Sequence, residues 1–233
     1  EPLFPDVRSY RILRAFAGTR PLYTPGGAAG RKASRNFHVV DHAEQGLDGM
    51  ISIFGGKLTT YRLMGERAAD KVCAKLGVTA PCRTAEEAIV PDPDEATLSR
   101  AAKYFPVQGI QLMADRMGDD LTPVLERAEK ADSNPLLCEC EMVSMAEIEC
   151  VARDASTHSL TDIRLRTRLG MGTCQGTFCS LRAVAALSEH NIPLEFSATD
   201  NVRRFLQERW GGLRPALWGM QAREMELGRA VYA

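Results

Sequence analysis

Apolar side chains in the first third of the chain follow two different spacings. Met50–Phe54 (MISIF) is a short apolar run that predicts a buried strand, and Phe37–Val40 (FHVV) is typical of a second strand. After Lys57, apolar side chains recur every three to four residues as far as Leu76. This spacing predicts a helix, and Gly77 is a suitable residue to end it.

Proline and glycine interrupt the helical patterns in the middle of the chain. The segment Thr79–Glu95 contains several prolines and predicts a linker. Residues 95–131 carry helical patterns that are broken near Pro106 and Gly118. We therefore expect a linker followed by several short helices.

A compact helical unit is expected over residues 136–190. Ser144–Glu147 (SMAE) and Ser159–Asp162 (SLTD) are capping boxes, in which a hydroxyl and a carboxylate satisfy the free amides at a helix start. The first box predicts a helix with a buried apolar face. The second predicts a basic helix that ends at Gly170. A third helix is expected to follow Cys179, with Leu181, Val184/Ala185 and Leu187/Ser188 along it.

The C-terminal region predicts short helical pieces. They follow Pro193 and are separated by the Gly211-Gly212 pair and by Pro215. Trp210 and Trp218 are interpreted as packing anchors within this region.

Composition and charge exclude several classes of protein. The 233 residues are 45% hydrophobic and 25% charged, which is ordinary for a globular chain of more than one unit. A net charge of −1 gives no strong field to attract nucleic acid or an anionic membrane. No apolar run approaches the ~18 residues of a membrane span, and seven cysteines at low density favour a reducing, cytoplasmic setting. Because the sequence opens on Glu1 rather than methionine, we expect the C-terminal part of a longer protein.

Four of the cysteines form two pairs beside predicted helix starts. Cys138 and Cys140 form a C-x-C pair, and Cys174 and Cys179 form a C-x4-C pair after thirty-three further residues. The free amides and positive dipole of a helix start favour thiolate over thiol. The glycines of GMGTCQG let the backbone approach and donate to sulfur. This pattern predicts a metal centre, either an iron–sulfur cluster or tetrahedral zinc.

Other interpretations of these thiols are weaker. Zinc knuckles prefer C-x2-C pairs, which neither pair here matches. A disulfide between Cys174 and Cys179 leaves Cys138 and Cys140 unexplained. A catalytic cysteine needs a nearby base, and none of the four histidines has an evident pairing with Cys179. The remaining cysteines fit isolated core positions: Cys73, Cys82 and Cys150.

The cysteine spacing resembles the small helical 2Fe–2S domain of bacterioferritin-associated ferredoxin, although many members of that family end in C-x2-C. The stretches LCECEMVSMAEIE and TRLGMGTCQGTFC are more similar to the version of this domain in the large subunit of anaerobic glycerol-3-phosphate dehydrogenases. The tail ERWGGLRPALWG is similar to the C-terminal end of these large subunits. The resemblance implies that one 2Fe–2S cluster is bound by four ligands: Cys138, Cys140, Cys174 and Cys179.

The stretch IFGGKLTTYR passes from the predicted strand through a glycine turn into a helix. Amides at this helix start, beside Lys57, form a ready anion site, with Thr59 or Thr60 able to cap the helix. The stretch is not a Walker A loop, because the first glycine of that motif is missing, and the chain contains no dinucleotide-binding fingerprint. Arg20 and Arg35 lie among turn residues, and a planar guanidinium is suited to bidentate phosphate recognition.

The segments AGTRPL, SRNF and GGKLTTYR resemble the substrate- and flavin-contacting segments of FAD-dependent glycerol-3-phosphate dehydrogenases. The resemblance implies that Arg20 and Arg35 hold the phosphate or hydroxyls of the substrate, and that Lys57 lies near flavin and substrate. Since the Gly-rich FAD loop of the family is not in this sequence, we expect most of the FAD site upstream and little activity from residues 1–233 alone. Backbone amides implied to line the flavin pocket belong to Gly55, Gly56, Leu58 and Thr59.

The resemblance covers nearly the whole chain and implies an α+β fold. The implied fold consists of the C-terminal remnant of an FAD-dependent oxidoreductase domain, followed by mostly helical domains with a small helical iron–sulfur module. The expected divisions are 1–78 for the end of the FAD and substrate domain, 79–134 for a linker and helical region, 135–190 for the 2Fe–2S domain and 191–233 for a helical tail.

The implied activity is oxidation of sn-glycerol 3-phosphate to dihydroxyacetone phosphate by FAD. The cluster would relay electrons singly toward partner subunits, including a membrane-anchoring electron-transfer subunit that passes them to a quinone. These partners would hold the protein on the inner face of the cell membrane. Arg164, Arg166 and Arg168 are interpreted as a solvated helix face, or as a docking site for an acidic electron-transfer partner. An alternative function stays open, that of a non-catalytic iron–sulfur or zinc module for iron sensing, cluster delivery or the assembly of subunits.

Overall fold

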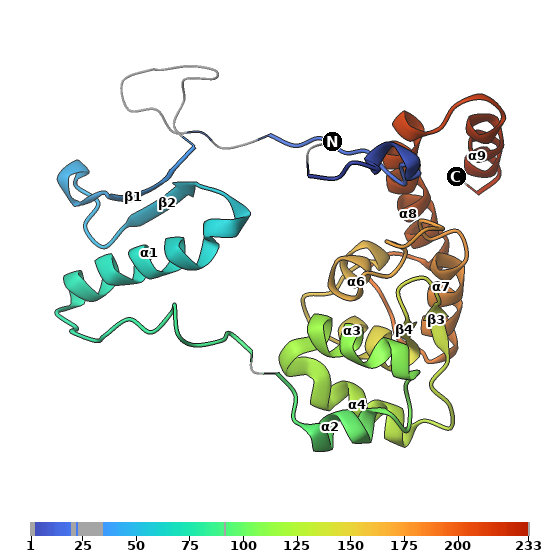
Figure 1. The fold of residues 1–233 in the computed structure, drawn as a ribbon, viewed down its shortest axis with the longest axis horizontal. Coiled ribbons are helices and arrows are strands. Elements are labelled where there is room, and N and C mark those ends of the chain that lie inside the picture. Colours follow the sequence, from blue (N-terminus) through green and yellow to red (C-terminus); the bar gives the residue numbers. More distant parts are fainter. Residues whose placement is uncertain (1–2, 20–21, 23–34, 91, 233) are drawn as a thin grey trace. The chain divides into compact units, whose positions relative to one another are not determined.

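The fold is α+β and mostly helical, as predicted, with two small two-stranded sheets in the part of the chain that the structure describes. The chain divides into two compact units: one comprises residues 17–91, and the other combines residues 1–16 with 92–233. The expected four-part division is finer than this and stays a prediction. The computed structural model (Figure 1) describes residues 3–19, 22, 35–90 and 92–232.

An antiparallel sheet and one helix form the first unit. Strands β1 (Phe37–Asp41) and β2 (Ile51–Gly55) pair so that the first residue of one faces the last residue of the other. Helix α1 (Tyr61–Leu76) lies against the sheet and ends at Gly77, which has a left-handed φ of 66°. Both predicted strands and the predicted helix are confirmed. The described part of this unit also contains two 3-10 turns, η3 (Ala43–Gln45) and η4 (Leu58–Thr60).

Gly55 and Gly56 make a turn that other residues do not fit. Their φ angles are 82° and 73°, in the left-handed region. A Cβ on Gly55 would lie 2.7 Å from the carbonyl oxygen of Asn36, and one on Gly56 would lie 2.6 Å from Sδ of Met64. The glycine pair therefore allows β2 to pass directly into the start of the following helix at Lys57.

The helices predicted over residues 95–131 open the second unit. The carboxylate of Asp94 accepts from the amide of Thr97 at 2.8 Å and caps the first of them. Pro106 directly precedes the second, and Gly118 ends it with a φ of 52°. The breaks predicted at these two residues are confirmed. The elements are α2 (Glu95–Ala101), α3 (Val107–Met117), η5 (Gly118–Asp120) and α4 (Leu121–Lys130).

Both predicted capping boxes open helices. The Ser144 amide donates to the Glu147 carboxylate at 2.7 Å, and the Glu147 amide donates to the Ser144 hydroxyl at 3.4 Å. Ser159 and Asp162 repeat this exchange at 2.9 and 3.3 Å. A small hairpin precedes the first box and carries the C-x-C pair. The elements are β3 (Leu136–Cys138), β4 (Val143–Ser144), α5 (Met145–Ala152) and α6 (Leu160–Thr167).

Three helix details differ from the predictions. Helix α6 stops before Gly170, because Arg168 already adopts a left-handed φ of 64°. In α7 (Cys179–Glu189), Leu181 is 46% exposed, so the buried face is rotated toward Ala183. Helix α8 (Ala198–Leu213) runs without a break through Gly211-Gly212, and two further helical segments follow. These are η6 (Arg214–Ala216) and α9 (Gly219–Tyr232).

The N-terminal segment explains why α8 tolerates a glycine pair. The amide of Ala15 donates to the carbonyl of Gly212 at 2.8 Å. A Cβ on Gly212 would lie 2.4 Å from Nε of Arg14, so glycine is required for this close approach. The segment, which includes η1 (Val7–Ser9), therefore packs against a helix about two hundred positions away in sequence.

One apolar core holds the second unit together, extending from α2 to α8. In the described part of the chain, no helix is both long and apolar enough to cross a membrane. Trp210 is half-buried, but Trp218 is 83% exposed, so the interpretation of Trp218 as a packing anchor is wrong within this chain. The largest fully buried apolar side chains are Met113, Leu125, Ile148, Leu160, Ile163 and Leu169.

Candidate metal centre

The structure brings the four predicted cysteines together as two pairs. Cys138 ends β3 and Cys179 begins α7, and both are buried. Each of these two side chains lies close enough to shift the pKa of the other. Cys140 is exposed and Cys174 is half-buried, and the side chain of Cys174 in turn lowers the pKa of Cys140. Each pair therefore joins one cysteine of the C-x-C motif to one of the C-x4-C motif.

The two thiols of the buried pair, Cys138 and Cys179, differ in pKa. The pKa of Cys138 is lowered to about 6, first because the Cys179 thiol donates to its sulfur, and further because the amides of Gly170 and Glu141 do so. Burial opposes this effect. The pKa of Cys179 is raised, because its proton is held in the bond to Cys138 and because burial disfavours a second charge. This difference in pKa favours Cys138 as the thiolate of the pair and Cys179 as the donor.

The exposed pair is stabilised from the loop before α7. The pKa of Cys140 is lowered by the Thr173 hydroxyl, whose Oγ1 lies 3.5 Å from the sulfur, and by the amide of Cys174. The negative charge of Cys138 acts on Cys140 and opposes the lowering of its pKa. The two pairs are thus one electrostatically linked set of thiols.

The thiols do not converge on one point. Among the described residues, no three His, Cys, Asp or Glu side chains are grouped so that they could hold a single metal ion. The arrangement is instead two thiol pairs, with backbone amides donating to the sulfurs of both. Such donors stabilise thiolates whether or not a metal is bound.

Glycines let the two cysteine segments approach. A Cβ on Gly172 would lie 2.3 Å from Cβ of Cys140, closer than any real contact. Gly170 and Gly176 have φ angles of 74° and 85°, and a Cβ on either would meet the ring of Phe205 within 3 Å. Gly172 therefore allows the close approach to the C-x-C segment that was predicted, whereas Gly170 and Gly176 make room for the ring of Phe205.

Two buried arginines that the motif analysis missed hold the cysteine segments. Arg116 on α3 donates to the carbonyls of Glu141 and Met142, at 3.0 and 2.8 Å, directly after the C-x-C pair. Arg209 on α8 donates to the carbonyls of Gln175 and Cys174, at 2.6 and 3.2 Å. Each anchors its loop from a distant helix.

A signal for Arg209 was present in the sequence. Val202, Phe205, Leu206 and Leu213 recur at helical spacing, and Arg209 interrupts that apolar stripe. A charged residue on an apolar helix face is buried, and must find polar partners there. Arg116 has no comparably clear local signal, because its partners lie on another hairpin.

The sequence comparisons bear on the whole chain. An alignment over 237 positions shows 43% identity to an anaerobic glycerol-3-phosphate dehydrogenase subunit of Escherichia coli K12 and covers 100% of the chain. Along its whole length, the chain is similar to this dehydrogenase subunit. The matching subunit of Haemophilus influenzae is 40% identical over 100% of the chain, and that of Haloferax volcanii is 39% identical over 99%.

The resemblance predicted from the motifs is therefore confirmed, and these relatives are named as dehydrogenases. The chain spans 43%, 42% and 39% of the lengths of the three relatives. No protein-family model and no solved structure matches the chain. The expectation that it is the C-terminal part of such a subunit stays a prediction.

The residues assigned to substrate and flavin by resemblance to the dehydrogenases are only partly described. Arg20 lies outside the described residues. Arg35 and Lys57 are both exposed. Lys57 stands at the helix start that the sequence predicted, where its amide donates to Thr60 Oγ1 at 3.1 Å. Leu58 is 88% exposed. The roles of these residues stay predictions.

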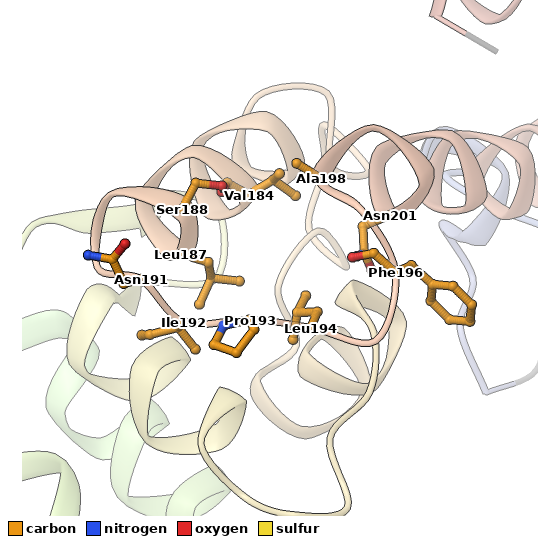
Figure 2. A pocket seen from close by; sticks show the side chains of 10 residues that line it. All are labelled: Val184, Leu187, Ser188, Asn191, Ile192, Pro193, Leu194, Phe196, Ala198 and Asn201. Atoms are coloured by element: carbon orange, nitrogen blue, oxygen red, sulfur yellow. The ribbon is translucent and has the colours of Figure 1, made fainter.

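A pocket of about 470 Å³ lies apart from the cysteines (Figure 2). Side chains of α7, of the segment before α8 and of the first turn of α8 line it, most of them apolar. Its buried amide, Asn201, is already used: Oδ1 accepts from Leu160, and Nδ2 donates to the carbonyls of Phe196 and Ser197. The pocket therefore offers little specific polar recognition.

Two further interpretations need correction. Cys82 is exposed, so it is not a core cysteine, whereas Cys73 and Cys150 are half-buried. Arg164 does not belong to a solvated face, because it is 9% exposed and lies 5.9 Å from the centre of the Phe205 ring. Its apolar surroundings come from α8, which sequence spacing within α6 does not reveal.

Proposed function

We propose that the chain is part of an FAD-dependent anaerobic glycerol-3-phosphate dehydrogenase and that its cysteines hold an electron-relay centre. The observation that carries this proposal is the meeting of Cys138 with Cys179 and of Cys140 with Cys174. Cysteines from two distant motifs pair across the same site, in a chain that is similar throughout to the dehydrogenase subunits.

The donor set fits a 2Fe–2S cluster better than zinc. Structural zinc is bound by four ligands around one ion, whereas a 2Fe–2S cluster is bound by four thiolates shared between two irons. Two thiol pairs with amide donors suit the second arrangement. When bound, such a cluster supplies one-electron chemistry. The residues that would hold it are Cys138, Cys140, Cys174 and Cys179.

The same proposal assigns Lys57 and Arg35 to substrate recognition, together with Arg20. The hydroxyl at carbon 2 of glycerol 3-phosphate would become the ketone of dihydroxyacetone phosphate, losing two electrons and two protons to the flavin system. The cationic side chains would bind the phosphate. The exposed helix start at Lys57 supports this assignment, since free amides and a lysine together favour an anion. Amides of Gly55, Gly56, Leu58 and Thr59 would line the flavin pocket.

We further propose that electrons leave through partner subunits toward a membrane quinone. A flavin accepts two electrons and a cluster one, so a relay centre in the same polypeptide matches the two kinds of carrier. The support for partner subunits is that the relatives are themselves named as subunits of their enzymes. In this scheme the protein binds the inner face of the membrane only through its partners.

The test is visible absorption, with iron and sulfide analysis, of the freshly purified chain under anaerobic conditions. We expect a brown protein with about two irons and two sulfides per chain. Cys138→Ser and Cys179→Ser should each lose the colour. Cys150→Ser is the matched control and should keep it, because Cys150 lies outside the two pairs. Zinc without iron or sulfide would contradict the proposal.

A redox titration of the complete enzyme distinguishes an electron-relay function of the cluster from that of a non-catalytic module. In the complete enzyme, glycerol 3-phosphate should reduce the cluster through the flavin. A cluster that stays oxidised while the flavin is reduced would indicate iron sensing, cluster delivery or assembly instead.

A further inference from the structure

Arg209 is a buried cation that directs three hydrogen bonds to the C-x4-C loop and a fourth, of 3.6 Å, to Sδ of Met225. It is 8% exposed and projects from α8. Besides the carbonyls of Cys174 and Gln175, its guanidinium donates to Oγ1 of Thr177 at 2.7 Å. One side chain therefore ties three positions of the C-x4-C segment, Cys174 and two residues after it, from a helix outside the motif.

The charge of Arg209 has no carboxylate beside it. The ion pairs found in the described part of the chain include none with Arg209, whereas the similarly buried Arg164 has a carboxylate oxygen of Glu208 at 3.9 Å. The guanidinium of Arg209 lies instead against the backbone of Cys174, one of the four proposed ligands. A buried guanidinium is costly unless it is paired. A negative thiolate centre supplies the missing charge.

We propose that Arg209 is a positioning residue that fixes the loop between Cys174 and Cys179 and compensates the negative charge of the thiolate centre. Its redox consequence rests on the proposed 2Fe–2S function. Adding one electron to a bound cluster makes the site more negative without breaking a bond. A nearby buried cation stabilises that reduced state more than the oxidised one. Arg209 therefore raises the reduction potential of the site.

The test compares three variants of the chain, each reconstituted anaerobically with iron and sulfide and titrated with dithionite by EPR. Arg209→Gln removes the charge, and Arg209→Lys keeps it. Arg203→Gln is the control, because Arg203 lies on the same helix but pairs with Asp200 at 3.0 Å. We expect Arg209→Gln to shift the balance between reduced and oxidised cluster about tenfold toward oxidised, which is about 59 mV for one electron. Arg209→Lys should recover most of this shift.

Two results would overturn the inference. The first is that the Arg209→Gln and Arg203→Gln variants have the same cluster reduction potential. The second is that Arg209→Lys has the same reduction potential as Arg209→Gln. If Arg209→Gln takes up no cluster, circular dichroism and Arg209→Lys decide: a folded lysine variant with a near-native potential supports the inference, and an unfolded one overturns it. Failure of the unsubstituted chain to bind iron and sulfide would count against the proposed function rather than against Arg209.

Discussion

Arg116 and Glu147 form a buried ion pair that joins helix α3 to the capping box of α5. Nε of Arg116 lies 2.6 Å from Oε1 of Glu147, and their side chains are 6% and 0% exposed. The other carboxylate oxygen accepts from the amide and hydroxyl of Ser144. The remaining arginine nitrogens reach the carbonyls of Glu141 and Met142. One guanidinium thus connects a helix start, a helix of the core and the loop after the C-x-C pair.

Removing this arginine should destabilise the fold strongly. Arg116→Ala leaves the Glu147 carboxylate buried without its cation, and breaking a buried pair costs about 3–5 kcal/mol. Urea denaturation of the chain measures the change in the free energy of unfolding. Arg100→Ala is the control. It removes an ion pair that is equally short, with 2.6 Å between Nε of Arg100 and Oε1 of Glu129, but more exposed, since the two side chains are 35% and 32% exposed. We expect a much smaller effect there, and equal losses in the two variants would refute the argument.

A methyl group on Gly172 should separate the two cysteine segments. Since its Cβ would lie 2.3 Å from that of Cys140, Gly172→Ala forces one loop to move. We expect iron and sulfide uptake by the anaerobic chain to fall several-fold. Gly211→Ala is the matched control, because no atom lies within 4 Å of its added Cβ in α8. That variant should bind normally and gain about 0.5–1 kcal/mol of stability. Normal uptake by Gly172→Ala would show that the close contact is not needed.

The stability of the metal-free chain should rise with pH between about 6 and 9. Cys138 has a pKa lowered to about 6 in the folded protein from an ordinary value of 9.0. In this window the unfolded chain holds more protons at this position, so raising the pH favours the folded state. The raised pKa of Cys179 opposes this rise only as the pH approaches 9, where the unfolded thiol begins to lose its proton while the folded thiol keeps it, so the slope levels off there. Urea denaturation under reducing conditions at pH 6, 7.5 and 9 measures the slope.

The matching variant is Cys138→Ser, which should flatten this pH dependence. An unchanged slope in the serine variant would mean that Cys138 is not the thiolate of the pair.

Limited proteolysis tests the boundary between the two compact units. Arg83 lies between α1 and α2, outside any helix or strand, with its side chain 66% exposed. Trypsin should therefore cleave after Arg83 before it cleaves after Arg127 within α4. Mass spectrometry should show a resistant product that begins near residue 84 and extends into α8 or beyond. Early cleavage after Arg127 instead would contradict the two-unit division.

Local sequence determined the helix starts and stops with good accuracy. The two capping boxes, the breaks at Pro106 and Gly118 and the end of α1 at Gly77 depend on atoms within four residues of one another, so a motif contains the whole cause. Predictions of helix ends failed where a segment far away in the sequence packs against the helix. Gly211-Gly212 has the composition of a helix break, yet α8 continues, because the N-terminal segment packs on Gly212 and needs a residue without a side chain.

The sequence by itself predicted a four-cysteine centre and glycines that allow a close approach, because spacing and residue type carry that information. Only the tertiary structure decided how they pair, which thiol loses its proton, and which cations hold the loops. Arg116 and Arg209 act on cysteine segments more than twenty residues away in the chain. Such partners are chosen by helix packing, and burial then gives each charge and each hydrogen bond its strength.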